Sequence, residues 1–491
     1  MPIIRHLTAL RRDNDGAILV FWGVSIAVVL GIVAMSFDIG RIASTQSELQ
    51  TYADNVALAA AGELDGKSDA ITRATGAATN LFTDTQAFGS GSQTLSASSF
   101  TLDFYATLPG SDQTSLAAGL TTNPNNAIYA RVVVAPKSVV FTFGAAFFGL
   151  TGATPANNQV GAVAVAGFTQ YACDITPMMF CIPSPSFDAD NPATIGDMIR
   201  LRSGGNGAAW GPGNFGFLEP STLALDSTGN CAGVGGTGPT LRCVLGAVGS
   251  ITQCFAVRGV DTEPGQKVGI TNDALNTRFD MWSGAMASEK NNPVYAPAPN
   301  VIKGIKPKSG GACNWNNTLP TTDTAKLPRD DCFPGCAPYG NGTWTSGRTN
   351  PVTGYVKKNY GATDPHPTAA TRYAYYLAEI AAHGGGASTT PILTGRSETG
   401  RRMCSINQSA DPERRVIIVA GIDCAANPIS GRATAVPVHQ FVKMFITEPV
   451  VANGQTNGLD IYAEIIGRAG GNGGGNSGSA GVFHDVVQLY R

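Results

Sequence analysis

The longest hydrophobic run of the chain lies near its N-terminus. Residues 16–37, GAILVFWGVSIAVVLGIVAMSF, include no charged side chain. At about 1.5 Å per residue, a helix over this run reaches roughly 33 Å, enough to cross a bilayer core. The alternative is a cleaved signal peptide, whose apolar core is usually about 7–15 residues long and ends in a small-x-small site. The greater length and the sequence MSFD at the exit favour a retained transmembrane helix over 16–37.

A different pattern follows over residues 38–64, where apolar and small side chains recur at spacings of three and four. This spacing predicts an amphipathic helix that continues from the membrane to about Leu64. Arg41 and Glu48 are expected on the opposite face. The narrow face suits packing on another helix of a partner or on the chain's own downstream domain, and both readings stay open. Its predicted members are Ile39, Ile42, Ala43, Gln46, Leu49, Gln50, Ala53, Val56, Ala57 and Ala60.

The next region, 65–168, is predicted to be rich in strands. Residues 127–136 and 160–168 carry valine-rich patterns bounded by turn residues. Between them, residues 138–150 form an apolar segment that is too short to span a bilayer. We expect this segment in the core, with a membrane-proximal or partner-binding patch as the alternative. Its phenylalanines are Phe141, Phe143, Phe147 and Phe148.

The C-terminal region, 371–491, alternates helix and strand signals after a loop-rich, cysteine-containing region over 169–370. Helix spacing covers 371–383 and ends at glycines 384–386. Apolar runs predict buried strands, and a glycine-rich loop precedes the last strand-like piece. This pattern favours an α+β or α/β fold over an all-β sandwich. The predicted strands are 414–424, 438–451, 460–468 and 482–490.

Composition limits the possible functions. Charged residues make up 14% of the 491 residues and the formal net charge is −2, so no basic excess indicates nucleic-acid binding. The 60 glycines and 29 prolines predict many turns and long loops.

All ten cysteines follow residue 172. An even number confined to one region is typical of disulfides in an oxidising compartment. Zinc is the competing reading, but it usually needs two short-spaced pairs, and Cys332 and Cys336 form the single close pair. The sequence does not reveal the connectivity. We expect Cys332 and Cys336 to form a structural bridge rather than a redox pair.

The basic residues around the apolar run predict its orientation. Arg5, Arg11 and Arg12 precede it, whereas Arg41 is the one nearby basic residue after it. The positive-inside bias therefore places residues 1–15 in the cytosol and the bulk of the chain on the other side of the membrane. This orientation agrees with the disulfides predicted from the cysteines.

The N-terminal segment resembles a known family. Gly16 with the apolar run, then DIGR (38–41) and ELQTYADNVALAAA (48–61), is similar to the N-terminal domain of TadE/TadG-like proteins of Tad, or Flp-type, pilus assembly. The large region after the span is closer to TadG than to the short TadE and TadF pseudopilins. The resemblance implies a single-pass inner-membrane protein with a periplasmic bulk and pilus-assembly partners.

Two family features are incomplete. A prepilin-type site has glutamate at the fifth position after the cleaved glycine, whereas here Phe21 follows Gly16 at that distance, so we expect no such processing. Some TadG-like proteins carry a von Willebrand A-type domain with an Asp-x-Ser-x-Ser metal site. Asp174 and Thr176 fit in part, but Met178 replaces a hydroxyl that Mg²⁺ prefers. A working metal site is therefore not expected, and whether a degenerate, metal-free domain of that type is present stays open.

Other motifs do not define a site. AGELDGKS, residues 61–68, fits a relaxed phosphate-loop pattern but is expected to end a helix, where Glu63 and Asp65 would repel phosphate. GxGxxG occurs at 211–216, 233–238 and 473–478, and none is expected to follow a strand and open a helix. Ser477 lacks the second glycine of a nucleophile elbow, and 188–197 is expected to be a solvated turn rather than a Ca²⁺ loop. The sequence therefore predicts no catalytic, cofactor-binding or metal-ligating residues.

These observations favour a non-enzymatic, membrane-anchored periplasmic scaffold of pilus assembly that acts by binding other proteins. Its expected partners are the inner membrane and other pilus-assembly proteins, with no nucleic acid and an undetermined oligomeric state. The first alternative is a membrane-tethered adhesin or ligand-binding module built on a degenerate von Willebrand-type surface. The second is a periplasmic hydrolase or thiol oxidoreductase that uses Cys332.

Overall fold

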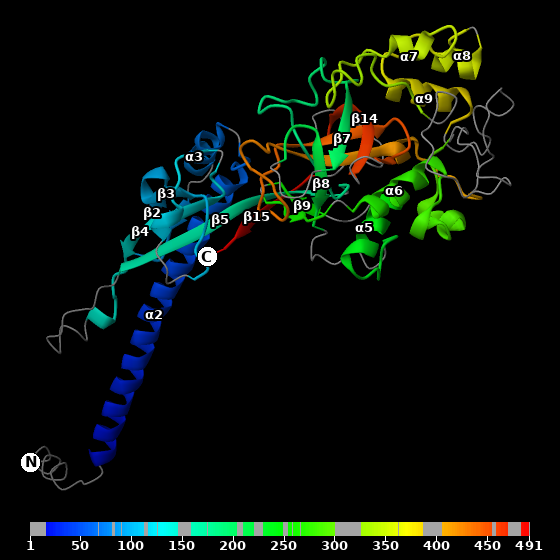
Figure 1. Ribbon diagram of the computed structural model, residues 1–491. Helices are drawn as coiled ribbons and strands as arrows, with labels where there is room; N and C mark the ends of the chain where they lie inside the picture. Colours follow the sequence, from blue (N-terminus) through cyan, green and yellow to red (C-terminus); the bar gives the residue numbers. More distant parts are fainter. Residues whose placement is uncertain are drawn as a thin grey trace, which may run out of the picture. The chain divides into compact units, whose positions relative to one another are not determined.

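The computed structural model describes residues 16–490 except 67, 81–83, 90, 112–115, 125, 146–158, 174, 204–209, 220–228, 249–253, 258, 266, 300–325, 362, 386–404, 454–457 and 470–482. The chain divides into two compact units (Figure 1). The first consists of Met1–Thr169 with Asp485–Arg491, and the second of Gln170–His484.

The first unit begins with one long helix, α2 (Gly16–Gly62), of 47 residues. At 1.5 Å per residue it is about 70 Å long, and its N-terminal part extends beyond the strands of the unit (Figure 1). This confirms the prediction of a helix that continues without a break to about Leu64. The other elements are α3 (Ala70–Asn80), β1 (Asp84–Gln86), β2 (Gln93–Leu95), β3 (Phe100–Tyr105), β4 (Tyr129–Ser138), β5 (Gln159–Cys173) and β15 (Phe483–Leu489).

The sheet of this unit runs in the order β15-β5-β4-β3, and the pairs β3–β4 and β4–β5 are antiparallel. One face carries alternating small and branched side chains, such as Val132 and Ala164, which are buried with the C-terminal part of α2 and with α3. Small residues on both sides let the helix approach the sheet closely. This core confirms the strands predicted over 127–136 and 160–168.

The last strand of the chain returns to the first unit. The N–H of Tyr490, directly after β15, donates to the carbonyl of Val165 at 2.8 Å. The ring of Tyr490 also meets Tyr129 edge-to-face, with centroids 5.1 Å apart. A side chain at Gly167 would lie within 3 Å of both rings, which explains the glycine there. The last strand of the predicted region 371–491 therefore belongs to the sheet of the first unit, whereas the other strands of that region belong to a different sheet.

The second unit is built around a sheet with short helices outside it. Its strands are β6 (Met178–Cys181), β7 (Met198–Ser203), β8 (Asn214–Leu218), β9 (Cys254–Ala256), β10 (Thr262–Glu263), β11 (Val416–Ile422), β12 (Gln440–Ile446), β13 (Val451–Asn453) and β14 (Gly458–Arg468). Its helices are α5 (Thr237–Gly246), α6 (Val268–Asn276), α7 (Thr345–Thr349), α8 (Tyr355–Tyr360) and α9 (Arg372–Ala382).

Six of these strands pair in a closed ring. β6 pairs with β11, β11 with β12, β12 with β14, β14 with β7, β7 with β8, and β8 again with β6. The pairs β6–β11 and β7–β8 are parallel and the other four are antiparallel. A ring of this kind is a small β-barrel, whose interior is filled by alternate side chains of every strand.

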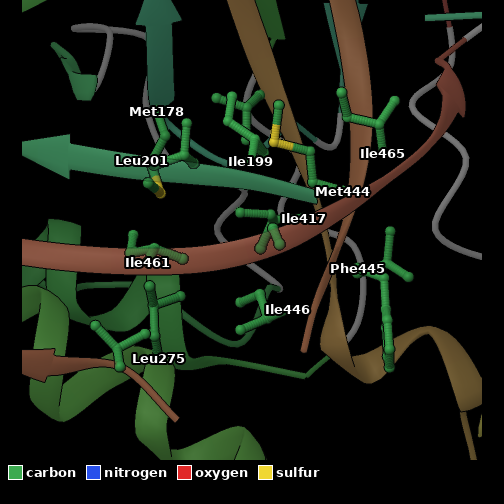
Figure 2. Close-up of a cluster of buried hydrophobic side chains, with 14 of the residues drawn as sticks. Met178, Ile199, Leu201, Leu275, Ile417, Met444, Phe445, Ile446, Ile461 and Ile465 are labelled. Carbon is green, nitrogen blue, oxygen red and sulfur yellow. The ribbon is translucent and has the colours of Figure 1, made fainter. Parts of the chain in front are cut away.

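The barrel interior is a continuous hydrophobic core. Figure 2 shows Met178, Ile199, Ile417, Met444 and Ile461 converging from five different strands. Neighbouring residues of the same strands, such as Met179 and Ile418, point outward into a second cluster. Because both faces of β6 and β11 are buried, their sequences read as unbroken apolar runs rather than as alternating patterns.

Helix α9 covers part of this barrel. The Thr371 hydroxyl accepts a hydrogen bond from the Ala374 N–H at 3.1 Å and caps the N-terminus. Tyr376 packs against Phe445 of β12, with ring centroids 5.0 Å apart. The helix ends where Gly384 takes a φ of +92°. The helix predicted over 371–383 is thereby confirmed.

The architecture is mixed helix and sheet with mainly antiparallel strands, consistent with the α+β alternative. A von Willebrand A-like fold is not confirmed. The strands predicted at 414–424, 438–451, 460–468 and 482–490 correspond to β11, β12 with β13, β14 and β15.

Candidate membrane anchor and its polar clamp

The N-terminal part of α2 exposes an apolar surface. Among the described residues, α2 is the one helix long and apolar enough to cross a membrane, judged by length and composition. A helix that is apolar on all sides and unburied requires an apolar surrounding. The large side chains that are more than half exposed are Leu19, Val20, Phe21, Trp22, Val24, Ile26, Val28, Val29, Leu30, Ile32, Val33, Met35, Phe37 and Ile39.

The apolar surface ends at a buried carboxylate. Asp38 is 3% exposed, although its neighbours Phe37 and Ile39 are 56% and 57% exposed. The backbone N–H groups of residues 142–144 donate to the Asp38 carboxylate at 2.9, 3.1 and 2.6 Å. A buried charge needs such donors, because an unsatisfied carboxylate is costly outside water. Asp38 therefore fastens the loop after β4 to the helix.

Arg41 lies one turn further along and holds two loops. Its guanidinium donates to the Val140 carbonyl at 3.0 Å, the Thr142 hydroxyl at 2.6 Å and the Gly89 carbonyl at 2.8 Å. Two turns beyond, the Glu48 carboxylate accepts from the N–H groups of residues 87 and 88 at 3.1 and 3.4 Å. We call Asp38, Arg41 and Glu48 the polar clamp. Arg41 and Glu48 were expected on the face opposite the apolar stripe, and the structure shows that both side chains bind loops of their own unit.

The buried stripe of α2 also differs in part from the predicted one. Leu49, Ala53, Val56, Ala57 and Ala60 are buried as expected. Ile39, Ala43 and Gln46 are exposed, and Tyr52 and Ala61 are buried in their place. Of the two readings left open, packing on the chain's own downstream domain is the one the structure shows. Below Leu49, Thr45 is buried and Ile42 packs partly against the core, so the predicted stripe is correct there only in part.

Part of the apolar segment over 138–150 lies in the described residues. Val140 and Phe143 are 53% and 48% exposed, so these two side chains do not lie in a core. Phe143 meets Phe37 edge-to-face, with ring centroids 5.4 Å apart. Phe141 is partly buried, and Phe147 and Phe148 lie outside the described residues. For Val140 and Phe143 the structure favours the surface alternative over the core.

The stretch AGELDGKS lies at the turn between α2 and α3. α2 ends at Gly62, and Gly66 has a φ of +83°. Arg73 of α3 forms ion pairs with Glu63, with Asp65 at 2.6 Å and with Asp69 at 3.2 Å. The prediction that this stretch ends a helix is confirmed, and its acidic side chains join two helices.

The candidate metal-binding stretches have structural roles. Asp174 lies outside the described residues, the Thr176 hydroxyl accepts from the Ile418 N–H at 3.2 Å, and Met178 lies inside the barrel. In the turn over 188–197, the Asp188 carboxylate pairs with Arg468 at 2.8 Å. Among the described residues, no three His, Cys, Asp or Glu side chains are grouped so that they could hold a metal ion.

The glycine motifs fall in three different settings. Residues 211–216 run into β8. Residues 233–238 lead into α5, but turn residues rather than a strand directly precede them, in line with the expectation that none both follows a strand and opens a helix. The third motif and Ser477 lie outside the described residues. None of the described motifs has the strand–glycine–helix order that binds phosphate.

Eight cysteines of the second unit form disulfides, as the sequence predicted. Cys173 and Cys254 are register partners of β5 and β9, and Cys181 links β6 to Cys424 after β11. The others are Cys231–Cys243 and Cys332–Cys336. Cys313 and Cys404 lie outside the described residues.

The second unit contains a buried cluster of charged side chains that the sequence did not predict. Arg372, at the first turn of α9, pairs with Asp330 and with Glu464 at 3.0 Å, and all three side chains are fully buried. Burial and the nearby Asp330 carboxylate raise the pKa of Asp197 to about 6. The partners lie 42 and 92 residues from Arg372, so no local spacing signals the cluster. The cluster fixes α9 to β14 and to the loop that carries Asp330.

The geometry thus defines a candidate anchor segment, an apolar helix whose polar end is clamped to the unit that follows. Residues 16–63 match the family described as "Putative Flp pilus-assembly TadE/G-like". The predicted resemblance is confirmed over this segment, which is α2 and the first residue after it. The match ends before β1 and includes none of the barrel. No curated protein and no solved structure matches the chain.

Proposed function

We propose that the chain is a membrane-anchored scaffold component of Flp-type pilus assembly that acts by binding other assembly proteins. The observation that carries the proposal is that the family match coincides with α2, the helix that has both the apolar surface and the polar clamp. The clamp fastens the first unit directly to the end of the span, without a flexible linker between them.

The proposed orientation places residues 1–15 in the cytosol and both units in the periplasm of the bacterial envelope. Arg5, Arg11 and Arg12 before the span support it through the positive-inside bias. The disulfides of the second unit support it independently, since such bridges persist in oxidising compartments. The inner membrane is the expected location.

We assign no reaction to the chain and propose binding as its mode of action. The buried carboxylates Asp330 and Glu464 bind Arg372 rather than lining an open site. The alanine-rich face of α2, a predicted contact surface for partners, is covered by the chain's own sheet. Partner contacts must therefore use other surfaces of the two units. An adhesin-like role and an enzymatic role stay predictions.

Removal of residues 16–37 behind a cleavable export signal tests the proposal. We expect the product to move from the membrane fraction to the soluble periplasm, and pilus assembly in a strain lacking the native protein to remain lost. The control replaces 16–37 with an unrelated apolar span of equal length and should restore membrane association. A deletion product that stays in the membrane contradicts the anchor, and normal pili without the protein contradict the assembly role.

A further inference from the structure

Exposed apolar side chains gather where α2 leaves the first unit. Val140 and Phe143 lie on the loop after β4, and Phe37 and Ile39 lie on the helix beside the clamp. Each of these four side chains is about half exposed or more. We call Phe37, Ile39, Val140 and Phe143 the apolar collar. It continues the apolar surface of the span across to a separate loop.

The polar groups around the collar are turned inward. The N–H groups of residues 142–144 donate to Asp38, and the Val140 carbonyl and Thr142 hydroxyl accept from Arg41. These bonds satisfy backbone groups that would otherwise need water. The described part of the loop can therefore present apolar side chains to a poorly hydrated surrounding while these backbone groups stay paired.

The collar also lies at a defined height. Asp38 follows the last residue of the predicted span, and Arg41 lies three residues, or about 4.5 Å, further along the axis. Both bind the 140–144 loop, so this loop is held within roughly one helical turn of the end of the span. That level corresponds to the boundary between acyl chains and headgroups, where aromatic side chains of membrane proteins concentrate.

We propose that the apolar collar rests in the headgroup boundary of the bilayer, so that the first unit lies directly on the membrane surface. The occupant of the collar is lipid, because the collar is continuous with the span through the Phe37–Phe143 contact. The polar clamp fixes how deeply the loop sits. This inference depends on α2 being the membrane anchor of the proposed function.

Tryptophan quenching in the full chain tests it. The chain is reconstituted into vesicles of phosphatidylethanolamine and phosphatidylglycerol with bromine atoms on the upper acyl chain, which quench nearby tryptophan emission. Trp22 is one of five tryptophans, so the Trp22→Phe chain, which keeps the other four, serves as the blank that is subtracted. In this background, the added emission of Phe143→Trp should be lower in brominated than in unbrominated vesicles, and Val140→Trp should behave in the same way. Circular dichroism checks that each variant folds.

The matched control is Leu120→Trp in the same background. Leu120 is an exposed apolar residue of the same unit, 57% exposed, and it bridges to Tyr105 beside the first residue of β4. The 10 residues of β4, about 30 Å of strand, separate it from the loop that carries the collar. Its emission should be insensitive to brominated lipid.

The difference in emission between the parent chain and the Trp22→Phe chain reports Trp22, which lies on the span itself, and this difference separates the two proposals. Quenched Trp22 together with unquenched Phe143→Trp and Val140→Trp would overturn the collar while the anchor stands, leaving this surface to a protein partner. Equal quenching at Leu120→Trp would also overturn it. Unquenched Trp22 would remove the anchor and the collar together.

Discussion

Asp38 is the residue at which α2 changes from an exposed apolar helix into part of a folded unit. It is buried between exposed Phe37 and Ile39 because three loop N–H groups compensate its charge. Hydrogen bonds to a charged group contribute about 1.5–3 kcal/mol each. A single acidic residue near the end of the apolar surface therefore sets the position of the loop after β4.

Asp197 provides a pH-dependent test at the same scale. Its folded pKa is raised from the ordinary 3.8 to about 6 by burial and by Asp330. A raised carboxyl pKa means that the folded state binds the proton more tightly than the unfolded state. The stabilisation is complete below about pH 4 and is lost as the pH rises through about 6.

We expect Asp197→Asn to remove the loss of folding stability that accompanies ionisation of Asp197. The variant should therefore gain stability relative to the wild type between about pH 4 and 7. Urea unfolding across that range measures the difference. Asp188→Asn is the control with opposite sign, because the Asp190 N–H and then Arg468 lower the pKa of Asp188. If the difference in unfolding free energy between Asp197→Asn and the wild type does not change with pH, the raised pKa of Asp197 is contradicted.

At the scale of the element, α2 is one helix with two surroundings. Its first part is apolar on all sides, and its second part buries a stripe of small residues on the β-sheet. Small side chains permit a close approach but leave no room for larger ones. Because α2 is continuous, the candidate span is joined to the first unit without a break.

Ala57→Leu tests this packing. Ala57 is fully buried between α2 and the sheet, so the larger side chain should destabilise the first unit by about 1–3 kcal/mol. Ala43→Leu, at an exposed position of the same helix, should cost less than about 0.5 kcal/mol. Denaturant unfolding of the detergent-solubilised chain compares them. Equal effects would contradict the packing of α2 on the sheet.

At the scale of the whole molecule, closure of the chain depends on contacts between distant segments. The barrel pairs β6 with β11, and the first sheet is completed by the C-terminal strand β15. Non-local pairing of this kind has a high loop-closure cost. Disulfides reduce that cost by restricting the unfolded chain.

The disulfides should therefore differ in their contribution. Cys181–Cys424 joins residues 243 apart, whereas Cys332–Cys336 spans 4. In the chain-entropy model, removal of the first bridge costs about 5 kcal/mol and removal of the second about 2 kcal/mol. Paired Cys→Ala variants compared by urea unfolding measure this order, and a larger loss from the short bridge would contradict it.

The sequence by itself determined the local features of this protein. These features are an uncharged run of bilayer length, a continuous helical spacing, valine-rich strands and a helix at 371–383 that ends at glycines. Each depends on residues close together in the chain. The resemblance to TadE/TadG-like proteins also lies in one short segment. For these features, hydrophobic period and turn residues are sufficient signals.

The tertiary structure alone decided which surfaces meet. The loop contacts of Arg41 and Glu48 were not predicted, because their acceptors and donors lie 39 to 101 residues away. The ring of six strands, the Arg372 cluster and the return of β15 likewise join segments whose spacing carries no local pattern. Such contacts form only when groups that are far apart in the sequence are removed from water together. They therefore depend on which pairs of groups are buried, and the periodicity of the sequence does not show those pairs.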